Sequence, residues 1–481
     1  MLPSVLFLLA TLPLACSHAP RGPVNVLLIS VDTLRPDRLS CYGYKNARTP
    51  NIDRLATEGV LFEHAYCDVP WTTPSFASVH TGLYAIHHGF RSTYQQLDDA
   101  NLTLAEFLKS KGYTTAAFIG SFPLDSSFHL NQGFDLYDEK FDTPSVVGGN
   151  EKVQEHIPSE FHANVDEQRL FQFLKGRADA YREDAKVSDA AIAWLHTQPR
   201  QPFFLWVHYF GPHERTDASL SDEDSRAKML REYDPDLQKT DQAVGHLLDA
   251  LREGGLDQHT LVILHADHGQ SLGEQFYFGH GKNLYDASLR IPLILRAPGR
   301  LPAGGRIASM VRNVDLFPTV LEFAGYTIPS GLDGRSLIAT INGRNDKEGE
   351  ETYCETYLSA TEAFGKLVRL EDNSVHRVGF IRRGVRTPEW MYVVNQPAPF
   401  IDYSNPPPVP EFVVKKYHTE ELYDLKKDPG ETLSLIGKRP LVEMMMHQKL
   451  TAYLQSSRAP GARHELDEAA KERMRALGYM K

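Results

Sequence analysis

Continuous apolar runs of strand length recur through the first 300 residues of the chain. They do not alternate with polar residues, which is typical of strands buried on both faces of a parallel sheet. The clearest runs lie at residues 24–31, 203–207, 260–264 and 290–295. A fifth strand is predicted at 114–119. The spacing between the runs leaves room for helices.

Several helices are predicted between these strands. One is expected from Pro50 to Gly59 and another from Thr72 to Gly82, because proline favours the first turn of a helix and glycine its end. Further helices are expected at 102–111, around 178–197, at 244–251 and at 314–324. Strands alternating with helices in this way predict an α/β fold, with a large doubly wound, mostly parallel sheet and helices on both faces.

The pattern changes near residue 345. Shorter strands are predicted at 353–357, 378–385 and 390–395, then a proline-rich loop near 406–410, then helices near 440–457 and 466–477. We therefore expect a catalytic domain over 24–345 and a smaller C-terminal α+β unit over 346–481. The polar stretch 138–200 is interpreted as an insertion that includes one helix.

The N-terminal 15 residues are almost wholly apolar, yet a bilayer span needs about 20. Residues 1–16 are predicted to be a signal peptide, so we expect an exported protein of the bacterial periplasm or cell envelope. The small residue before Cys16 also resembles a lipoprotein cleavage site, which would anchor the chain to the membrane through an acylated Cys16. Pro13 and the lack of a preceding Lys or Arg argue against lipidation, and a buried strand is the alternative interpretation.

Composition excludes some classes without selecting a function. The 481 residues carry 51 Lys+Arg and 62 Asp+Glu, a net charge of −11, with 42 % hydrophobic residues. These are ordinary globular values. An acidic chain without a basic cluster is not expected to bind nucleic acid. Four cysteines without a CxxC pair provide neither a disulfide framework nor a zinc motif.

Candidate chemistry gathers where the buried runs end. Asp32, His208 and the pair Asp267-His268 follow or close three of them. Ligands of open α/β sheets bind beyond the carboxyl ends of the strands, so we expect these side chains to converge. Asp32, Asp267 and His268 offer two carboxylates and an imidazole nitrogen, a set suited to Zn²⁺, Mn²⁺ or Ca²⁺. A solvated turn is the alternative for an isolated Asp-His pair.

Three further residues could act on a substrate at this edge. Thr72 begins a helix, whose N-terminus favours an anion, and a divalent cation would make its hydroxyl a nucleophile. The plainer interpretation of Thr72 is an N-cap. His213, and His280 between two glycines, suit protonation of a leaving group or contacts to phosphoryl or sulfuryl oxygens. Most of the 20 histidines are expected to be packing or surface residues.

Short motifs follow one another along the chain at residues 25–37, 49–59, 70–75, 266–269, 280–286, 290–292 and 421–431. Taken in this order, they resemble the sulfatase-like branch of the alkaline phosphatase superfamily. The resemblance implies a metal bound by Asp32, Asp267 and His268, with the nucleophile Thr72 as a further ligand. It also implies catalytic or oxygen-binding roles for His213 and His280, and for Lys282 if the register shifts by one residue.

The departures from the family pattern bear on the substrate. Authentic sulfatases oxidise the first residue of a Cys/Ser-x-Pro-x-Arg motif to formylglycine, but here Thr72 and Phe76 stand at its first and last positions. Threonine would give a ketone instead of the aldehyde. Thr33 replaces a second metal-binding Asp, and residues 118–123 lack the Lys-x-His segment that contacts sulfate in many members.

Relatives that cleave phosphodiesters do use a threonine nucleophile on a metal. The chain is therefore expected to be an exported, metal-dependent hydrolase of anionic phosphate or sulfate esters, with phosphoesters or phosphodiesters preferred. Two alternatives stay open. One is a sulfuric ester hydrolase without formylglycine, and the other is an inactive sulfatase-like protein that binds an anionic glycan.

Overall fold

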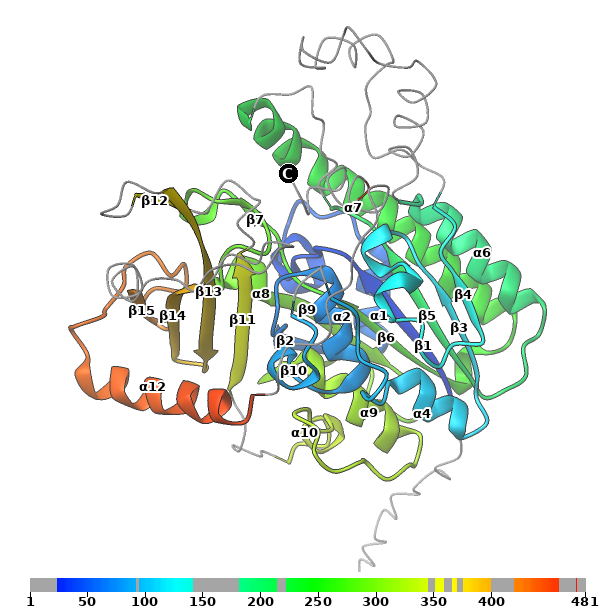
Figure 1. Ribbon diagram of the computed structural model, residues 1–481. Helices are drawn as coiled ribbons and strands as arrows, with labels where there is room; N and C mark the ends of the chain where they lie inside the picture. The colour runs from blue at the N-terminus through cyan, green and yellow to red at the C-terminus, as the bar shows by residue number, and fades with distance from the viewer. Residues whose placement is uncertain are drawn as a thin grey trace, which may run out of the picture.

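An eight-stranded mixed sheet forms the centre of the computed structural model (Figure 1). The structure describes residues 24–91, 95–141, 181–213, 222–344, 351–358, 366–369, 375–398 and 419–457, together with Arg473. The strand order is β10 (Gly305–Arg312), β2 (Val60–Tyr66), β9 (Arg290–Arg296), β6 (Thr260–Ala266), β1 (Asn25–Val31), β5 (Phe203–Tyr209), β3 (Thr114–Phe118) and β4 (Leu136–Asp138).

Within this sheet only β9 is antiparallel to its neighbours β2 and β6, so the prediction of a mostly parallel sheet is confirmed. Every residue of β1, β5 and β6 is buried, which explains their continuous apolar sequences. The run predicted at 290–295 forms the antiparallel β9. Strands β2, β4 and β10 were not predicted.

Helices cover both faces of the sheet (Figure 1). On one face α1 (Pro50–Glu58), α6 (Asp184–His196) and α7 (Asp222–Glu253) pack together, and on the other lie α2 (Thr72–Thr81), α4 (Leu104–Ser110) and α9 (Leu316–Phe323). Among the described residues no helix is both long and apolar enough to cross a membrane. Short helices complete the unit: α3 (Ala85–His88), α8 (Asp286–Leu289) and α10 (Ile338–Ile341).

The predicted α+β unit follows as an antiparallel sheet covered by α12 (Pro440–Gln455). Its core joins side chains from strands and helix, among them Tyr353, Val385, Tyr392, Met446 and Leu450. The strands are β11 (Thr352–Leu358), β12 (Lys366–Arg369), β13 (Val375–Arg386), β14 (Trp390–Ala398) and β15 (Thr419–Asp424). The predicted signal segment 1–16, most of the insertion 138–200, and the helix expected near 466–477 (apart from Arg473) lie outside the described residues.

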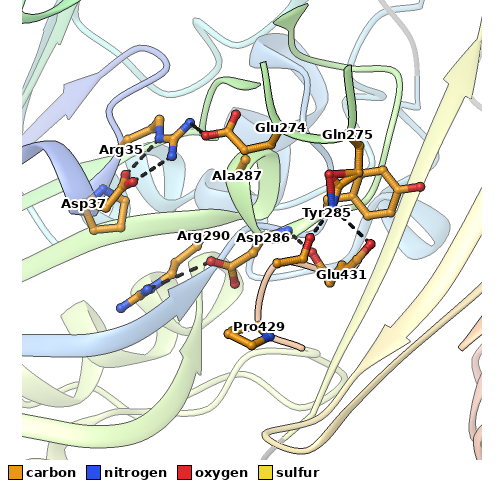
Figure 2. Close-up of a pocket in the computed structure, with 12 residues that line it drawn as sticks. Arg35, Asp37, Glu274, Gln275, Tyr285, Asp286, Ala287, Arg290, Pro429 and Glu431 are labelled. Carbon is orange, nitrogen blue, oxygen red and sulfur yellow. Dashed lines mark hydrogen bonds and ion pairs between the residues drawn. The ribbon is translucent and has the colours of Figure 1, made fainter. Parts of the chain in front are cut away.

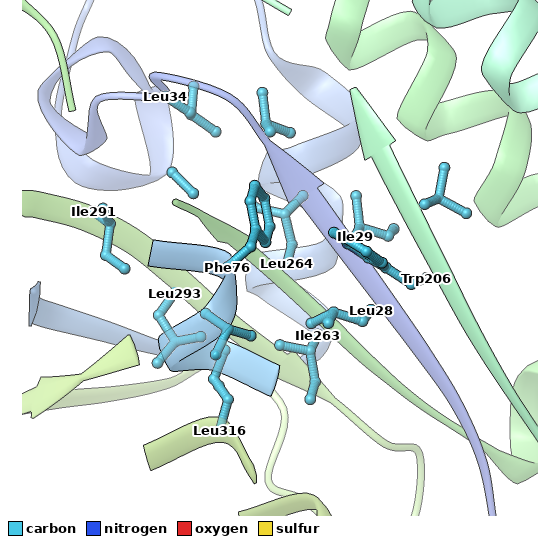
Figure 3. Close-up of a cluster of buried hydrophobic side chains, with 14 of the residues drawn as sticks. Leu28, Ile29, Leu34, Phe76, Trp206, Ile263, Leu264, Ile291, Leu293 and Leu316 are labelled. Carbon is cyan, nitrogen blue, oxygen red and sulfur yellow. The ribbon is translucent and has the colours of Figure 1, made fainter. Parts of the chain in front are cut away.

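Helix α2 packs across the middle of the large sheet and fixes the position of the catalytic candidates. Its residues are all buried, and Phe76 contacts Trp206 of β5 at 5.1 Å between ring centroids. Figure 3 shows Phe76 and Trp206 among the aliphatic side chains of β1, β6 and β9. The helix therefore starts from a well-packed layer, with its first residue at the carboxyl edge of the sheet.

Candidate active site

The predicted convergence at the sheet edge is confirmed. Strands β6, β1 and β5 are neighbours, so their carboxyl ends bring Asp267-His268, Asp32 and His208 together. Nε2 of His268 lies 3.4 Å from Oδ2 of Asp267 and 3.9 Å from Oδ1 of Asp32. One ligand atom from each of these three residues lies within 4.8 Å of the others, and all three side chains are fully buried.

The hydrogen bonds around this cluster leave the ligand atoms of Asp32, Asp267 and His268 directed toward one another. Nδ1 of His268 donates to the carbonyl of Gly269 at 2.9 Å, so the neutral ring presents an unprotonated Nε2 to the two carboxylates. Oδ1 of Asp267 accepts from the backbone N–H groups of Thr33 and His268. Neither oxygen of Asp32 accepts a hydrogen bond from the part of the chain that the structure describes. Buried carboxylate oxygens without donors fit a bound divalent cation.

Burial sets the charge state of these groups. It raises the pKa of Asp32 well above its usual value, and the neighbouring Asp267 charge raises it further. Burial also raises the pKa of Asp267 to about 7 and lowers that of His268 to about 4. A cation among them would favour the ionised carboxylates and the neutral imidazole, which are the forms that bind metal.

Thr72 is the first residue of α2, and the N-cap is Trp71. The interpretation of Thr72 as an N-cap is therefore wrong, because the extended residue before the helix is Trp71. The Thr72 Oγ1 atom lies 3.3 Å from Nε2 of His268. Ser75 ties this helix start to the strand end by donating its hydroxyl to the carbonyl of Asp267 at 2.7 Å. The hydroxyl predicted as nucleophile thus faces the metal-type cluster.

His280 and His213 stand beside the same cluster. The His280 ring stacks on that of His268 at 4.5 Å and meets that of His213 at 5.0 Å. Nδ1 of His280 donates to Oε1 of Gln270 at 2.9 Å, which leaves Nε2 unprotonated in the neutral ring. Burial, with the nearby histidines, lowers the pKa of His280 well below its ordinary value. His213 is buried and stacks on Phe210 at 4.5 Å.

The other two candidates lie farther out. The Lys282 ammonium is 5.8 Å from the ring centroid of Tyr277, and its charge contributes to the lowered pKa of His280. His208 accepts a hydrogen bond at Nδ1 from the backbone N–H of Gly120, so its proton is on Nε2, 3.9 Å from Oδ2 of Asp32. A protonated nitrogen cannot bind a metal, and His208 therefore neighbours the cluster without completing it.

Phe76 fills the position at which the family motif carries arginine. Its ring is fully buried and packs against Trp206, His208 and His265 at centroid distances of 5.1, 5.3 and 6.0 Å. An aromatic ring packed against His208 therefore lies where the motif would place a guanidinium.

Two residues near the site were not predicted from the sequence. Gln270, two residues after His268, selects the tautomer of His280. Thr356, in the C-terminal unit, accepts a hydrogen bond from the Trp71 indole at 3.1 Å. The position of Gln270 after the Asp-His-Gly motif was a usable signal, whereas Thr356 has no local signature.

A pocket of about 180 Å³ lies outside this cluster, between the two units (Figure 2). Arg35 forms one wall and pairs with Asp37 and Glu274, while Glu431 and Tyr285 line another. A guanidinium N–H of Arg35 also donates to the carbonyl of Gln270 at 2.8 Å. The pocket thus adjoins the loop that carries Gln270, and its lining includes none of the predicted catalytic residues.

An α/β sheet with a metal-type ligand set and a facing hydroxyl at its carboxyl edge is suited to the hydrolysis of charged esters. Residues 24–326 match the model of the Sulfatase family, and the chain belongs to that family. Rattus norvegicus steryl-sulfatase is 28 % identical over 73 % of this chain and 77 % of its own. Bacteroides thetaiotaomicron N-acetylglucosamine-6-O-sulfatase is 24 % identical over an alignment that covers 91 % of this chain and 88 % of that enzyme.

Solved structures share the fold at lower identity. The phosphonate monoester hydrolase of Agrobacterium radiobacter superposes with a TM-score of 0.67 at 22 % identity, covering 90 % of this chain and 96 % of that enzyme. The predicted family and fold class are therefore confirmed. The chain is a sulfatase-family ester hydrolase whose relatives include enzymes named for sulfate esters and for phosphonate monoesters.

Proposed function

We propose that this protein is an exported, metal-dependent hydrolase that uses Thr72 as its nucleophile, with phosphate monoesters or diesters as preferred substrates. The observation that carries the proposal is the position of the Thr72 hydroxyl, 3.3 Å from Nε2 of His268 at the edge of an inward-facing Asp-Asp-His set. Thr72 also opens α2, whose free N–H groups favour an anionic ester.

A divalent cation held by Asp32, Asp267 and His268 would lower the pKa of the Thr72 hydroxyl and offset negative charge on the ester oxygens. Nε2 of His280, unprotonated at rest, accepts the proton of Thr72 as Oγ1 attacks phosphorus. The ester bond to the leaving alcohol breaks, and the His280 imidazolium returns the proton to that alcohol. His213, beside His280, binds a nonbridging oxygen.

A second step restores the enzyme. Water attacks the phosphorus of the Thr72 ester and loses a proton to His280, and the bond from phosphorus to Oγ1 breaks. His280 then returns the proton to Oγ1, so the net reaction is hydrolysis.

Two residues favour phosphorus over sulfur as the centre attacked. Threonine cannot be oxidised to formylglycine, and Phe76 puts a ring where the family motif has a cation. The fold neighbour named as a phosphonate monoester hydrolase agrees with chemistry at phosphorus. Sulfate ester hydrolysis is the second candidate, since the curated relatives reported above are named sulfatases.

The decisive experiment strips the purified mature protein with a chelator and reloads it with Zn²⁺, Mn²⁺ or Ca²⁺. Each form is assayed on an aryl sulfate, an aryl phosphate and a bis-aryl phosphate. Dominant turnover of either phosphate substrate supports the proposal, and dominant turnover of the sulfate overturns the preference for phosphorus. Bound metal without turnover of any of the three overturns the hydrolase assignment and favours a protein that binds an anionic glycan.

Export and lipidation are tested separately by expressing the full chain in a bacterial host. We expect the signal peptide to be cleaved, after residue 16 or, in a lipoprotein, just before Cys16, and the protein to be recovered in the cell envelope. Cys16→Ala should release the protein from the membrane fraction if Cys16 is acylated. An uncleaved N-terminus in the cytoplasmic fraction would contradict export.

A further inference from the structure

The segment 269–290, which carries Gln270 and His280, is held by the C-terminal unit at several points. Tyr285 donates its hydroxyl to Glu421 at 3.1 Å, and the backbone N–H of Asp286 donates to Glu431 at 2.6 Å. Arg386 pairs with both Asp286 and Glu431. Figure 2 shows Glu431 beside Asp286 and Gln275 at this junction. The second unit thus braces the loop of the catalytic histidine.

A further contact of the C-terminal unit reaches the residues next to the reacting groups. Thr356 lies on β11 and is fully buried. Its Oγ1 accepts a hydrogen bond from Nε1 of Trp71 at 3.1 Å and donates one to the carbonyl of Gly281 at 2.5 Å. The direction of both bonds is fixed, because an indole N–H only donates and a carbonyl only accepts. The single hydroxyl hydrogen of Thr356 is therefore used.

The two partners of Thr356 adjoin the two residues that do the chemistry. Trp71 precedes Thr72 and is the N-cap of α2, while Gly281 follows His280. The Trp71 ring meets the His280 ring edge-on at 5.5 Å. Gly281 has φ +78°, and a Cβ there would lie 2.2 Å from the Trp71 indole. The loop and the helix start are in close contact, and Thr356 links them.

We propose that Thr356 is a positioning residue through which the C-terminal unit completes the active site. It holds the His280 loop against Trp71, so that the His280 ring stays stacked on His268 beside Thr72. The inference rests on the proposed function, because it assigns Thr356 a part in the proton transfers by His280. A misplaced imidazole would slow the chemical step while the metal ligands and the oxygen-binding groups stay in place.

Three variants separate positioning from general stability. Thr356→Val keeps the shape and removes the hydroxyl, whereas Thr356→Ser keeps the hydroxyl. Thr352→Val is the matched control, because Thr352 is also fully buried on β11 but donates to the carbonyl of Tyr353. Each variant is compared with the wild type for melting temperature, bound metal, kcat and KM on the best ester.

We expect Thr356→Val to lower kcat by about 10- to 100-fold, with KM within about twofold and full metal content. The loss should be larger for alkyl than for nitrophenyl leaving groups, because poor leaving groups depend more on a proton from His280. Thr356→Ser should recover most of kcat, and Thr352→Val should keep the wild-type kcat whatever its melting temperature.

The outcomes distinguish this inference from the function on which it rests. Equal losses of kcat in Thr356→Val and Thr352→Val would overturn the positioning role and leave the hydrolase assignment standing. So would a Thr356→Ser variant as slow as Thr356→Val, or a loss independent of the leaving group. A metal-loaded wild type without activity on any ester would overturn both.

Discussion

Two sets of buried polar atoms lie near the large sheet, one at its carboxyl edge and one under α2, and their surroundings differ. At the carboxyl edge, the oxygens of Asp32 have no hydrogen-bond partner among the described residues, yet they face Asp267 and His268. Under α2, both ring nitrogens of His80 also have none, and this ring lies 4.4 Å from that of Trp206 and 6.0 Å from that of Phe134. The first set converges on one point, whereas the second lies against aromatic rings.

The comparison shows which property marks a site. Burial lowers the pKa of His268 to about 4 and that of His80 to about 3, so a perturbed pKa does not distinguish the two. Convergence does, because several unsatisfied ligand atoms at one point can be satisfied together by a cation, whereas an isolated unsatisfied imidazole only reduces stability.

Removing the hydroxyl at the edge should abolish turnover. Thr72→Ala is expected to lower kcat by about 10⁴-fold or more, because the proposed nucleophile is lost. Thr72→Ser should retain measurable activity, since it keeps a hydroxyl at the first residue of α2. The measurement is steady-state kinetics on the best ester with metal content determined in parallel. Wild-type turnover by Thr72→Ala would show that Thr72 is not the nucleophile.

Disrupting the converging set of Asp32, Asp267 and His268 should abolish the proposed metal binding. Asp267→Asn is expected to lose most bound divalent cation and at least about 10²-fold in activity, because an amide is a weaker and uncharged ligand. Loading the wild type at 100-fold excess over its dissociation constant should stabilise it by about 2.7 kcal/mol, and the variant far less. Elemental analysis and calorimetric melting measure both effects. Undiminished metal in Asp267→Asn would place the ion elsewhere.

Loss of the histidine beside the cluster should have a smaller effect. His280→Ala is expected to lower kcat by about 10²- to 10³-fold, the usual contribution of a general acid–base group. Gln270→Ala should cost about tenfold, because the ring is kept but its tautomer is no longer selected. Kinetics on substrates of graded leaving-group pKa measure both effects. A His280→Ala variant that still cleaves alkyl esters normally would exclude proton transfer by this residue.

The sequence predicts those parts of the fold whose burial is complete. Strands β1, β5 and β6 are buried on both faces, so their apolar runs revealed them, and the residues that end them identified the metal-type cluster. Strand β2 was missed because Glu63 and His64 interrupt its apolar run, and β10 because polar residues alternate along it. The reversed direction of β9 leaves no mark on its composition, since a strand between two buried neighbours is apolar either way.

The residues of the site also divide into those that the sequence predicts and those that it does not. Asp32, Asp267 and His268 could be predicted because chain order and strand ends place them. Thr356 could not, because its partners Trp71 and Gly281 are 285 and 75 residues away in sequence. Only the packing of the second unit on the first brings its hydroxyl to the active-site loop.

Substitution of His80 is expected to have the smallest effect on activity, and it tests the contrast between the converging cluster and the isolated imidazole most directly. His80→Leu should leave kcat and metal content unchanged and should keep or raise the melting temperature at pH 7, because it removes two unsatisfied nitrogens from aromatic surroundings.

Burial lowers the pKa of His80 to about 3 from the ordinary 6.5, so the unfolded chain binds more protons than the folded chain between these two pH values. Stability therefore falls as the pH drops below 6.5, and at pH 5 this group alone costs roughly 2 kcal/mol. Denaturant unfolding at pH 7 and pH 5 should show a smaller loss in His80→Leu than in the wild type. Equal losses in the two proteins, or a fall in kcat, would mean that His80 has a partner or a role in the site, and the contrast between the two regions would not hold.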